Sequence, residues 1–262
     1  MIVCAGDGRG LPDDFESRYP GVVSIRTPGA SVFGLRGEAL RRARGEIVLI
    51  TEDHCEVPPD WCRALLDTLA AYPNAAAAGG AVENGSTDNM IDWASYLVAH
   101  APMMPPIQGG PARRISLQAG MALRRRALPK SIPPRGFMET VYVPRLARNG
   151  ELLVGNAGIV VRHKESAGSW RTFAVHFHNG RSIAGFRRPD LGPGALALRI
   201  ASTLILPAYL LLRSTAAVFR KGRHRGLLIA SLPLMAPMAM CHAAGELVGY
   251  LTGEGRSPQA MS

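Results

Sequence analysis

Residues 46–61, EIVLITEDHCEVPPDW, constrain the fold of this chain more than any other stretch. The apolar run EIVLI has the length and character of a buried strand. The segment PPDW then predicts a helix, because proline is favoured in a helix's first turn. Between the two stand Glu52, Asp53 and His54, three consecutive ionisable residues. In α/β proteins ligands bind outside the carboxyl ends of the strands, so this turn is a candidate site.

Strands and helices alternate on both sides of this turn. Apolar runs predict further strands in MIVCAGDG, GVVSIRTPG, AAAAGGAVEN, ISLQAGMALRR and GIVVRH, the last of which ends at His163. Helical spacing of apolar residues predicts helices in GLRGEALRRARG, PPDWCRALLDTLAAYP and NMIDWASYLVAHAPM, and around residues 139–149, where Pro144 marks a first turn or a kink. The alternation predicts an α/β domain with a mostly parallel sheet flanked by helices.

The turn after the strand has the residue types of a metal site. On an extended segment, side chains two residues apart share a side, so Glu52 and His54 face together while Asp53 faces away. A carboxylate and an imidazole can hold a divalent cation such as Mg²⁺ or Mn²⁺, with phosphate oxygens in the remaining positions. On spacing alone, a solvated loop with an acidic cap before the helix is an equal alternative.

The composition limits the classes of partner that the chain is expected to bind. With 47% hydrophobic and 19% charged residues, the chain can form a substantial core. The formal charge of +10 is uneven, because ten basic and only three acidic side chains lie from Arg181 onward. Basic charge in an apolar segment points to anionic lipid, and no nucleic-acid partner is expected. The four cysteines form no C-x-x-C pair, which favours a reducing compartment, and Cys55 and Cys62 are expected to be packing residues rather than ligands.

The last third of the chain is apolar from about residue 193. Two stretches, ALALRIASTLILPAYLLLRSTAAVF and GLLIASLPLMAPMAMCHAAGELVGYLTG, are joined by RKGRHR. The charge-free part of the first, residues 200–212, is shorter than the roughly 20 residues of a spanning helix, and prolines interrupt the second. A transmembrane hairpin would also place the basic loop outside, against the positive-inside tendency. A monotopic or re-entrant helical pair is therefore favoured, with the hairpin and a soluble helical subdomain as alternatives.

The segment ALRRARGEIVLITEDHCEVPPDWCRALL resembles the central motif of family 2 glycosyltransferases, in which a basic helix, A-x-G-E, an apolar strand, an acidic DxD turn and P-x-x-W follow one another. GGAVEN, ISLQAGMALRRRAL, GFMETVYVPRLARNGELL and IVVRHKE continue in the family's order. The resemblance covers about residues 1–185. It implies a GT-A fold and an inverting, metal-assisted transfer of a sugar from a nucleotide-diphosphate donor to a lipid-linked or polysaccharide acceptor.

The resemblance also implies roles for the metal and the base. Glu52 and His54 stand where the family has metal-binding acids, and His163 matches a histidine that can complete the site. Glu139 matches the first acid of the family's E-D pair, whereas Thr140 replaces the second, so Glu139 is the expected general base. The structural alternatives are a helix N-terminal acid for Glu139 and an ordinary strand-end histidine for His163.

Three further residues are implied to contact the donor. Asp7 matches the first acidic turn loosely, Arg36 matches the segment that reaches the donor, and Asp53 faces the donor's sugar or the loop. A plain turn aspartate and a solvated arginine are the alternatives for Asp7 and Arg36. In HFHNGR, residues 176–181, two histidines alternate as on a strand near the family's acceptor or diphosphate-binding region, with little indication of a metal role.

The expected organisation has two parts. Residues 1–185 form the transferase domain on the cytoplasmic face, and residues 186–262 form a membrane-associated helical region. No segment matches the P-x-Y/F-N strand with which relatives begin, so the sequence is expected to start downstream of its true initiation site, with a degenerate family member of impaired donor binding as the alternative. A non-catalytic, membrane-anchored binding or scaffold module that keeps the fold without the chemistry is the alternative function.

Overall fold

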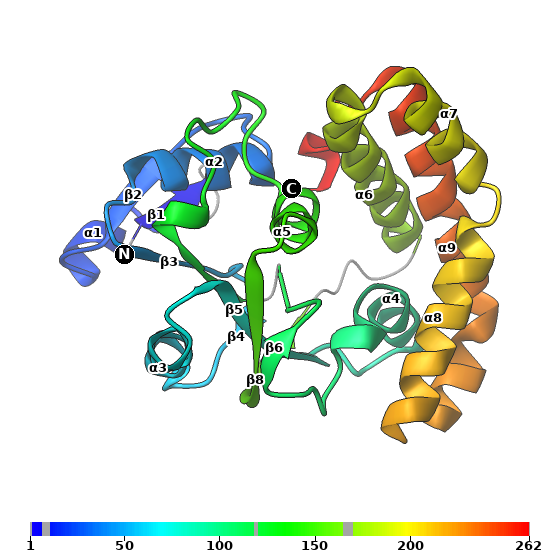
Figure 1. Ribbon diagram of the computed structural model, residues 1–262, viewed down its shortest axis with the longest axis horizontal. Helices are drawn as coiled ribbons and strands as arrows, with labels where there is room; N and C mark the ends of the chain where they lie inside the picture. Colours follow the sequence, from blue (N-terminus) through cyan, green and yellow to red (C-terminus); the bar gives the residue numbers. More distant parts are fainter. Residues whose placement is uncertain (1, 7–10, 118–119, 165–169, 262) are drawn as a thin grey trace.

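A computed structural model describes residues 2–6, 11–117, 120–164 and 170–261 (Figure 1). Its centre is a six-stranded sheet in the order β3-β7-β5-β8-β4, with β6 paired to β8. Three strands run in one direction: β3 (Ile47–Ile50), β5 (Ala75–Asn84) and β8 (Leu152–His163). Three run in the other: β7 (Met121–Arg124), β4 (Cys55–Glu56) and β6 (Gly110–Ala112). A separate parallel pair consists of β1 (Ile2–Ala5) and β2 (Val23–Arg26).

The α/β class is confirmed, but the prediction of a mostly parallel sheet is wrong. In the described six-stranded sheet only β5 and β8 are parallel neighbours, because β7 lies between β3 and β5 and runs against both. Alternation along the sequence predicts which segments are strands, whereas their order depends on contacts between distant residues. The strands β3, β5 and β8 still end at the same edge, where the predicted site lies.

Helices cover both faces of the sheet (Figure 1). The predicted helices are α2 (Val32–Arg42), α3 (Trp61–Ala71), α4 (Met90–His100) and α5 (Glu139–Arg148). The helices α3 and α4 pack on one face and α2 and α5 on the other. Shorter helices are α1 (Phe15–Arg18) and the 3₁₀ turns Ala101–Met103, Arg125–Ala127, Arg188–Asp190 and Gln259–Met261.

Two of these helices begin at side-chain caps. The Ser31 hydroxyl accepts a hydrogen bond from the Gly34 N–H at 3.2 Å at the start of α2, and the Asn89 side-chain oxygen Oδ1 accepts one from the Asp92 N–H at 2.9 Å at the start of α4. Small alanines make β5 buried along most of its length, so helices approach both of its faces closely.

The apolar C-terminal region folds differently from the predicted pair. It forms three helices, α7 (Pro193–Ser202), α8 (Leu206–Lys221) and α9 (Arg225–Thr252), because the first apolar stretch bends by 66° between α7 and α8. Before them, α6 (Arg171–Arg187) contains the two histidines of HFHNGR, so the strand expected there is wrong. The predicted domain boundary between 185 and 186 falls inside α6, which packs along α9.

Candidate functional site

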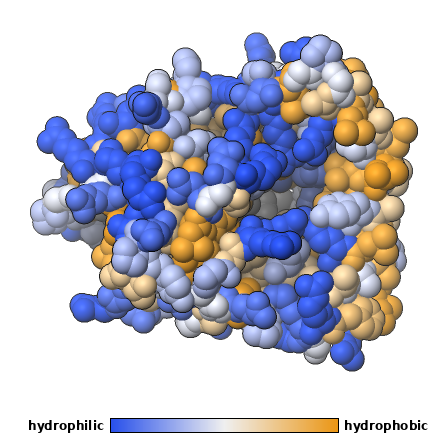
Figure 2. All heavy atoms as spheres, viewed as in Figure 1, coloured by the Kyte–Doolittle hydropathy of each residue, from blue (hydrophilic) through white to orange (hydrophobic). Residues whose placement is uncertain are grey.

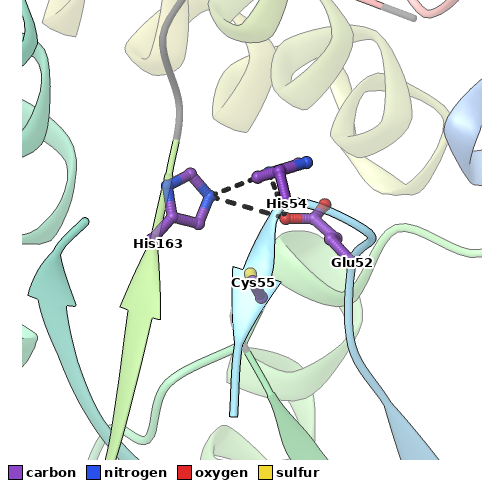
Figure 3. A group of neighbouring side chains, drawn as sticks. All are labelled: Glu52, His54, Cys55 and His163. Carbon is purple, nitrogen blue, oxygen red and sulfur yellow. Dashed lines mark hydrogen bonds and ion pairs between the residues drawn. The ribbon is translucent and has the colours of Figure 1, made fainter. Parts of the chain in front are cut away.

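The site lies at the shared carboxyl edge of β3, β5 and β8 (Figure 3). Glu52 and His54 occupy the turn after β3, and His163 is the last residue of β8. Between them, the short strand β4 turns back and pairs Cys55 directly with His163. The Lys164 N–H also donates to the His54 carbonyl oxygen at 3.0 Å, which fixes the turn beside the end of β8.

Three ligand atoms converge at this edge. The Glu52 Oε2 atom lies 3.2 Å from His54 Nε2 and 3.6 Å from His163 Nε2, and the two Nε2 atoms are 3.2 Å apart. Metal–ligand bonds of about 2.0–2.1 Å in a tetrahedral site place the ligand atoms about 3.3–3.4 Å from one another. The residues present therefore fit a divalent cation without rearrangement.

Neighbouring side chains hold these ligands in orientation. Asp53 Oδ1 lies 3.0 Å from His54 Nδ1, the carboxylate–imidazole contact that commonly orients a metal-binding histidine. Glu52 Oε1 accepts a hydrogen bond from Arg36, so only Oε2 faces the two imidazoles. The His163 ring packs on the half-buried His100 ring, with centroids 4.8 Å apart. Each contact leaves the convergent atom of its ligand available to a cation.

Arg36 links the candidate metal ligands Glu52, His54 and His163 to the expected base, Glu139. Its Nη2 atom donates to Glu52 Oε1 and its Nη1 atom donates to Glu139 Oε1 at 2.7 Å. Arg36 comes from α2 and is buried, and Glu139 begins α5 and is fully buried. Gly136 makes this approach possible, because at φ +98° its backbone contacts the Phe33 carbonyl, where a Cβ atom would overlap.

The charges of the cluster are coupled. Burial raises the pKa of Glu52, but hydrogen bonds from His163 and His54 and the charge of Arg36 hold it well below its usual range. The hydrogen bond to Glu52 raises the pKa of His54 to about 9 despite burial. A proton therefore occupies the cluster at neutral pH, and a cation would displace it.

Three other groups near the cluster titrate unusually. Burial raises the pKa of Glu139 above its ordinary value, although Arg36 opposes the effect. Burial also raises the pKa of the Cys55 thiol to about 12, and lowers that of His100 to about 3, so His100 is neutral behind His163. A neutral imidazole behind a metal ligand adds no repulsion to a bound cation.

The structure brings most of the predicted site residues together. One network contains Glu52, His54, His163, Arg36 and Glu139. Arg36 lies between two carboxylates and not in solvent. The Asp53 side chain is fully exposed, as expected for a residue that faces away from Glu52. Its carboxylate nevertheless contacts His54. Asp7 lies outside the described residues.

Two residues were not predicted as part of the site. Cys55 was expected to be a packing residue, yet its Sγ atom is one of four potential ligand atoms that all lie within 4.8 Å of one another. Its position beside His54 in the sequence was the available signal. His100 ends α4, and nothing in its local sequence indicates that it contacts His163. Behind it, a cavity of about 10 Å³ is lined by Asn84, Asp92, Ser95, Tyr96, His100 and His163.

Two comparisons with known proteins found a match. Residues 11–128 match the family described as "Glycosyl transferase family 2". Among solved structures, the chain is similar to the mannosyltransferase PcManGT from Pyrobaculum calidifontis, in complex with GDP-Man and Mn²⁺. The identity is 16%, the TM-score is 0.53, and the match covers 94% of this chain and 77% of the other. This likeness shows a shared GT-A-like fold. The search of curated proteins found no match.

Proposed function

The chain belongs to the family 2 glycosyltransferases and is a sugar-transferring enzyme, and from this premise we propose its reaction in more detail. It moves a sugar, with inversion, from a nucleotide-diphosphate donor to an acceptor at the cytoplasmic face of a membrane, assisted by a divalent cation. The observation that carries the proposal is the convergence of Glu52, His54 and His163 at the sheet edge, linked through Arg36 to Glu139.

The first three of these residues would hold the cation. A bound divalent cation offsets the charge that develops on the diphosphate leaving group. The sequence suggested Mg²⁺ or Mn²⁺, and of these two ions the imidazole ligands favour Mn²⁺, because Mg²⁺ prefers oxygen ligands alone. The presence of Mn²⁺ in PcManGT supports this choice.

Glu139 is the proposed general base. Its Oε1 atom is held by Arg36, whereas Oε2 has no hydrogen-bond partner among the described residues. A raised pKa makes a carboxylate a stronger proton acceptor, as removal of the acceptor hydroxyl's proton requires. In an inverting transfer, this hydroxyl attacks the sugar from the side opposite the diphosphate.

Two further residues are proposed to contact the donor. The Arg36 guanidinium is a cation beside the site of the diphosphate and can exchange its bond to Glu52 for a phosphate oxygen. The Asp53 carboxylate is fully exposed at the rim and can accept hydrogen bonds from sugar hydroxyls.

An apolar outer face supports association with a membrane. Figure 2 shows apolar residues along the edge of the molecule that α7, α8 and α9 form. The exposed large apolar side chains of this edge are Leu198, Leu204, Ile205, Tyr209, Leu212, Phe219, Ile229, Leu232, Met240 and Leu251. An exposed apolar surface rich in neighbouring basic residues fits a lipid interface, which would keep a lipid-linked or polysaccharide acceptor near the site.

The helices are proposed to lie in the interface and not to cross the bilayer. Among the described residues, α9 alone is long and apolar enough to span, and α7 with α8 passes only as a bent pair. The connection between α8 and α9 is bound to the sheet domain, because Arg223 donates to Glu83 at 2.6 Å and Lys221 donates to the Pro106 carbonyl at 2.8 Å. In a hairpin that crosses the bilayer, this connection would be separated from the domain by roughly 30 Å of hydrocarbon.

The donor site can be tested with the full chain in detergent or liposomes. Thermal stability is measured with Mn²⁺ or Mg²⁺, alone and together with UDP or GDP. Stabilisation by a nucleotide that requires the cation, and that disappears in Glu52→Ala, is expected. If no combination of cation and nucleotide stabilises the chain, the donor assignment is wrong.

The base is tested by release of nucleoside diphosphate from a panel of nucleotide sugars with lipid or glycan acceptors. Glu139→Gln is expected to lower turnover by about 10²–10⁴-fold, while metal-dependent nucleotide binding stays. Asp67→Asn, at an exposed position on α3, is the matched control and should match the parent chain. Undiminished turnover in Glu139→Gln would exclude Glu139 as the base.

A further inference from the structure

Cys55 adds a fourth potential donor atom to the candidate metal site. Its Sγ atom and the ligand atoms of Glu52, His54 and His163 all lie within 4.8 Å of one another (Figure 3). Cys55 and His163 are direct partners across the β4–β8 ladder, so their side chains leave the sheet on the same face. The Cys55 N–H donates to the Glu52 carbonyl oxygen at 3.1 Å, which fixes the cysteine backbone against the turn.

These four donors differ chemically from an all-carboxylate site. Two imidazole nitrogens, one carboxylate oxygen and one sulfur form the mixed set that binds Zn²⁺ and Co²⁺, whereas Mg²⁺ selects oxygen ligands. We propose that Cys55 is the fourth protein ligand of this site, and that the four side chains bind Zn²⁺ or Co²⁺ tetrahedrally before any nucleotide is present. The inference rests on the metal site of the proposed function but not on sugar transfer.

The ligands do not need a nucleotide to arrange them. Asp53 orients His54, and Arg36 orients Glu52, so their convergent atoms are fixed by contacts within the chain. Four protein ligands complete a tetrahedral cation in the absence of nucleotide, and a donor phosphate oxygen would enter as a fifth ligand. On binding, the Cys55 thiol and the His54 imidazolium each release a proton to solvent, while Glu52 is already ionised.

The visible and near-ultraviolet spectrum of bound Co²⁺ tests both parts of the proposal, which are the cysteine ligand and tetrahedral binding without nucleotide. The full chain is freed of metal with a chelator, kept reduced, and titrated with Co²⁺ without nucleotide. The expected spectrum has the intense visible bands of tetrahedral cobalt together with a near-ultraviolet charge-transfer band from a thiolate ligand. Weak bands of octahedral cobalt, or no binding until a nucleotide is added, would overturn the proposal.

Substitutions then identify the sulfur. Cys55→Ser should lose the charge-transfer band, whereas Cys62→Ser, at an exposed position on α3, should keep it. Circular dichroism of each variant confirms that it is folded. A charge-transfer band that persists in folded Cys55→Ser, or that disappears in Cys62→Ser, assigns the sulfur elsewhere and overturns the proposal.

Failure of this proposal differs from failure of the proposed function. A parent chain that transfers sugar with Mn²⁺ but shows no thiolate–cobalt band removes Cys55 as a ligand and leaves the reaction intact. A chain with the full cobalt spectrum but no transfer from any nucleotide sugar keeps the four-ligand site and removes the proposed donor chemistry.

Discussion

Arg36 and Glu139 are 103 residues apart in the sequence and form a buried ion pair with an N–O distance of 2.7 Å. The same guanidinium also bonds Glu52, so one cation neutralises two carboxylates from different elements. Because the pair connects α2 to the start of α5, it fixes the expected base relative to the metal cluster. This contact gives Arg36 a structural role beside its proposed donor contact.

Arg36→Met should therefore destabilise the chain strongly. It leaves the buried Glu139 and the nearly buried Glu52 without their cation, and breaking a buried pair in this way costs about 3–5 kcal/mol. The free energy of unfolding from urea denaturation is the measurement. Arg41→Met is the matched control on the same helix, because Arg41 pairs with Glu38 at the surface, and a change below about 1 kcal/mol is expected there. Equal losses in both variants would contradict this role.

The metal-free chain should lose stability as the pH rises above neutral. The pKa of His54 is raised to about 9 by its bond to Glu52, so the folded state binds a proton that the unfolded state releases at about 6.5. This contribution is complete below the unfolded pKa and is lost as the pH rises through about 9. Urea denaturation from pH 6 to pH 10 in a chelator tests it, and His54→Gln should flatten this part of the curve.

The loss of stability that is expected at acid pH has a different cause. The pKa of Glu52 is held below its ordinary value by His163, His54 and Arg36 in spite of burial. Its contribution is present above the unfolded pKa and is lost as the pH falls toward the folded value. Glu52→Gln should therefore weaken the loss of stability in acid. A variant with the parent's acid slope would show that other carboxyl groups cause it.

The sequence allowed the prediction of the elements and of the turn that carries the site, because both depend on neighbouring residues. The run EIVLITED gave β3 and the positions of Glu52 and His54, and GIVVRH gave the end of β8 at His163. Contacts between distant segments were not accessible in this way. Cys55 joins the cluster only because β4 pairs with β8, and Arg36 meets Glu139 only because α2 and α5 pack together.

The arrangement of the C-terminal helices likewise could not be predicted from neighbouring residues. Their apolar composition was evident, but the bend between α7 and α8 and the binding of Arg223 to Glu83 depend on the packed structure. In α6, two histidines with a spacing of two residues suggested a strand, whereas the surrounding seventeen residues form a helix that packs on α9. Packing against α9 outweighed the short-range alternation.

The outer face of α7 and α8 should bind lipid. Leu204→Asp combined with Ile205→Asp removes two exposed side chains, each worth about 1.5–3 kcal/mol when fully buried, so partition into anionic liposomes should fall at least about tenfold. Co-sedimentation measures it. Leu66→Asp, at an exposed position on α3, is the control and should bind like the parent chain. Unchanged partition of the double variant would exclude this face.

The orientation of α8 and α9 can be tested separately. In sealed vesicles, an impermeant maleimide should label Arg220→Cys, at the exposed end of α8, from the same side as the native Cys62 on α3. An in-plane pair keeps both on one side, because the α8–α9 connection stays on the domain. Labelling of the two positions from opposite sides would establish a crossing hairpin.

Close packing of α6 on α9 should depend on Gly245. A Cβ atom at this position would overlap the Phe177 carbonyl oxygen of α6, so Gly245→Ala must separate the helices. Overpacking of this kind costs about 1–3 kcal/mol. Alanine is favoured over glycine in a helix by about 1 kcal/mol, so the upper part of the overpacking range exceeds this gain. Thermal or urea unfolding measures the difference. Gly226→Ala is the matched control on the same helix, where a Cβ atom meets nothing within 4 Å and should stabilise the chain slightly. Stabilisation by both substitutions would mean that α6 and α9 are not closely packed at Gly245.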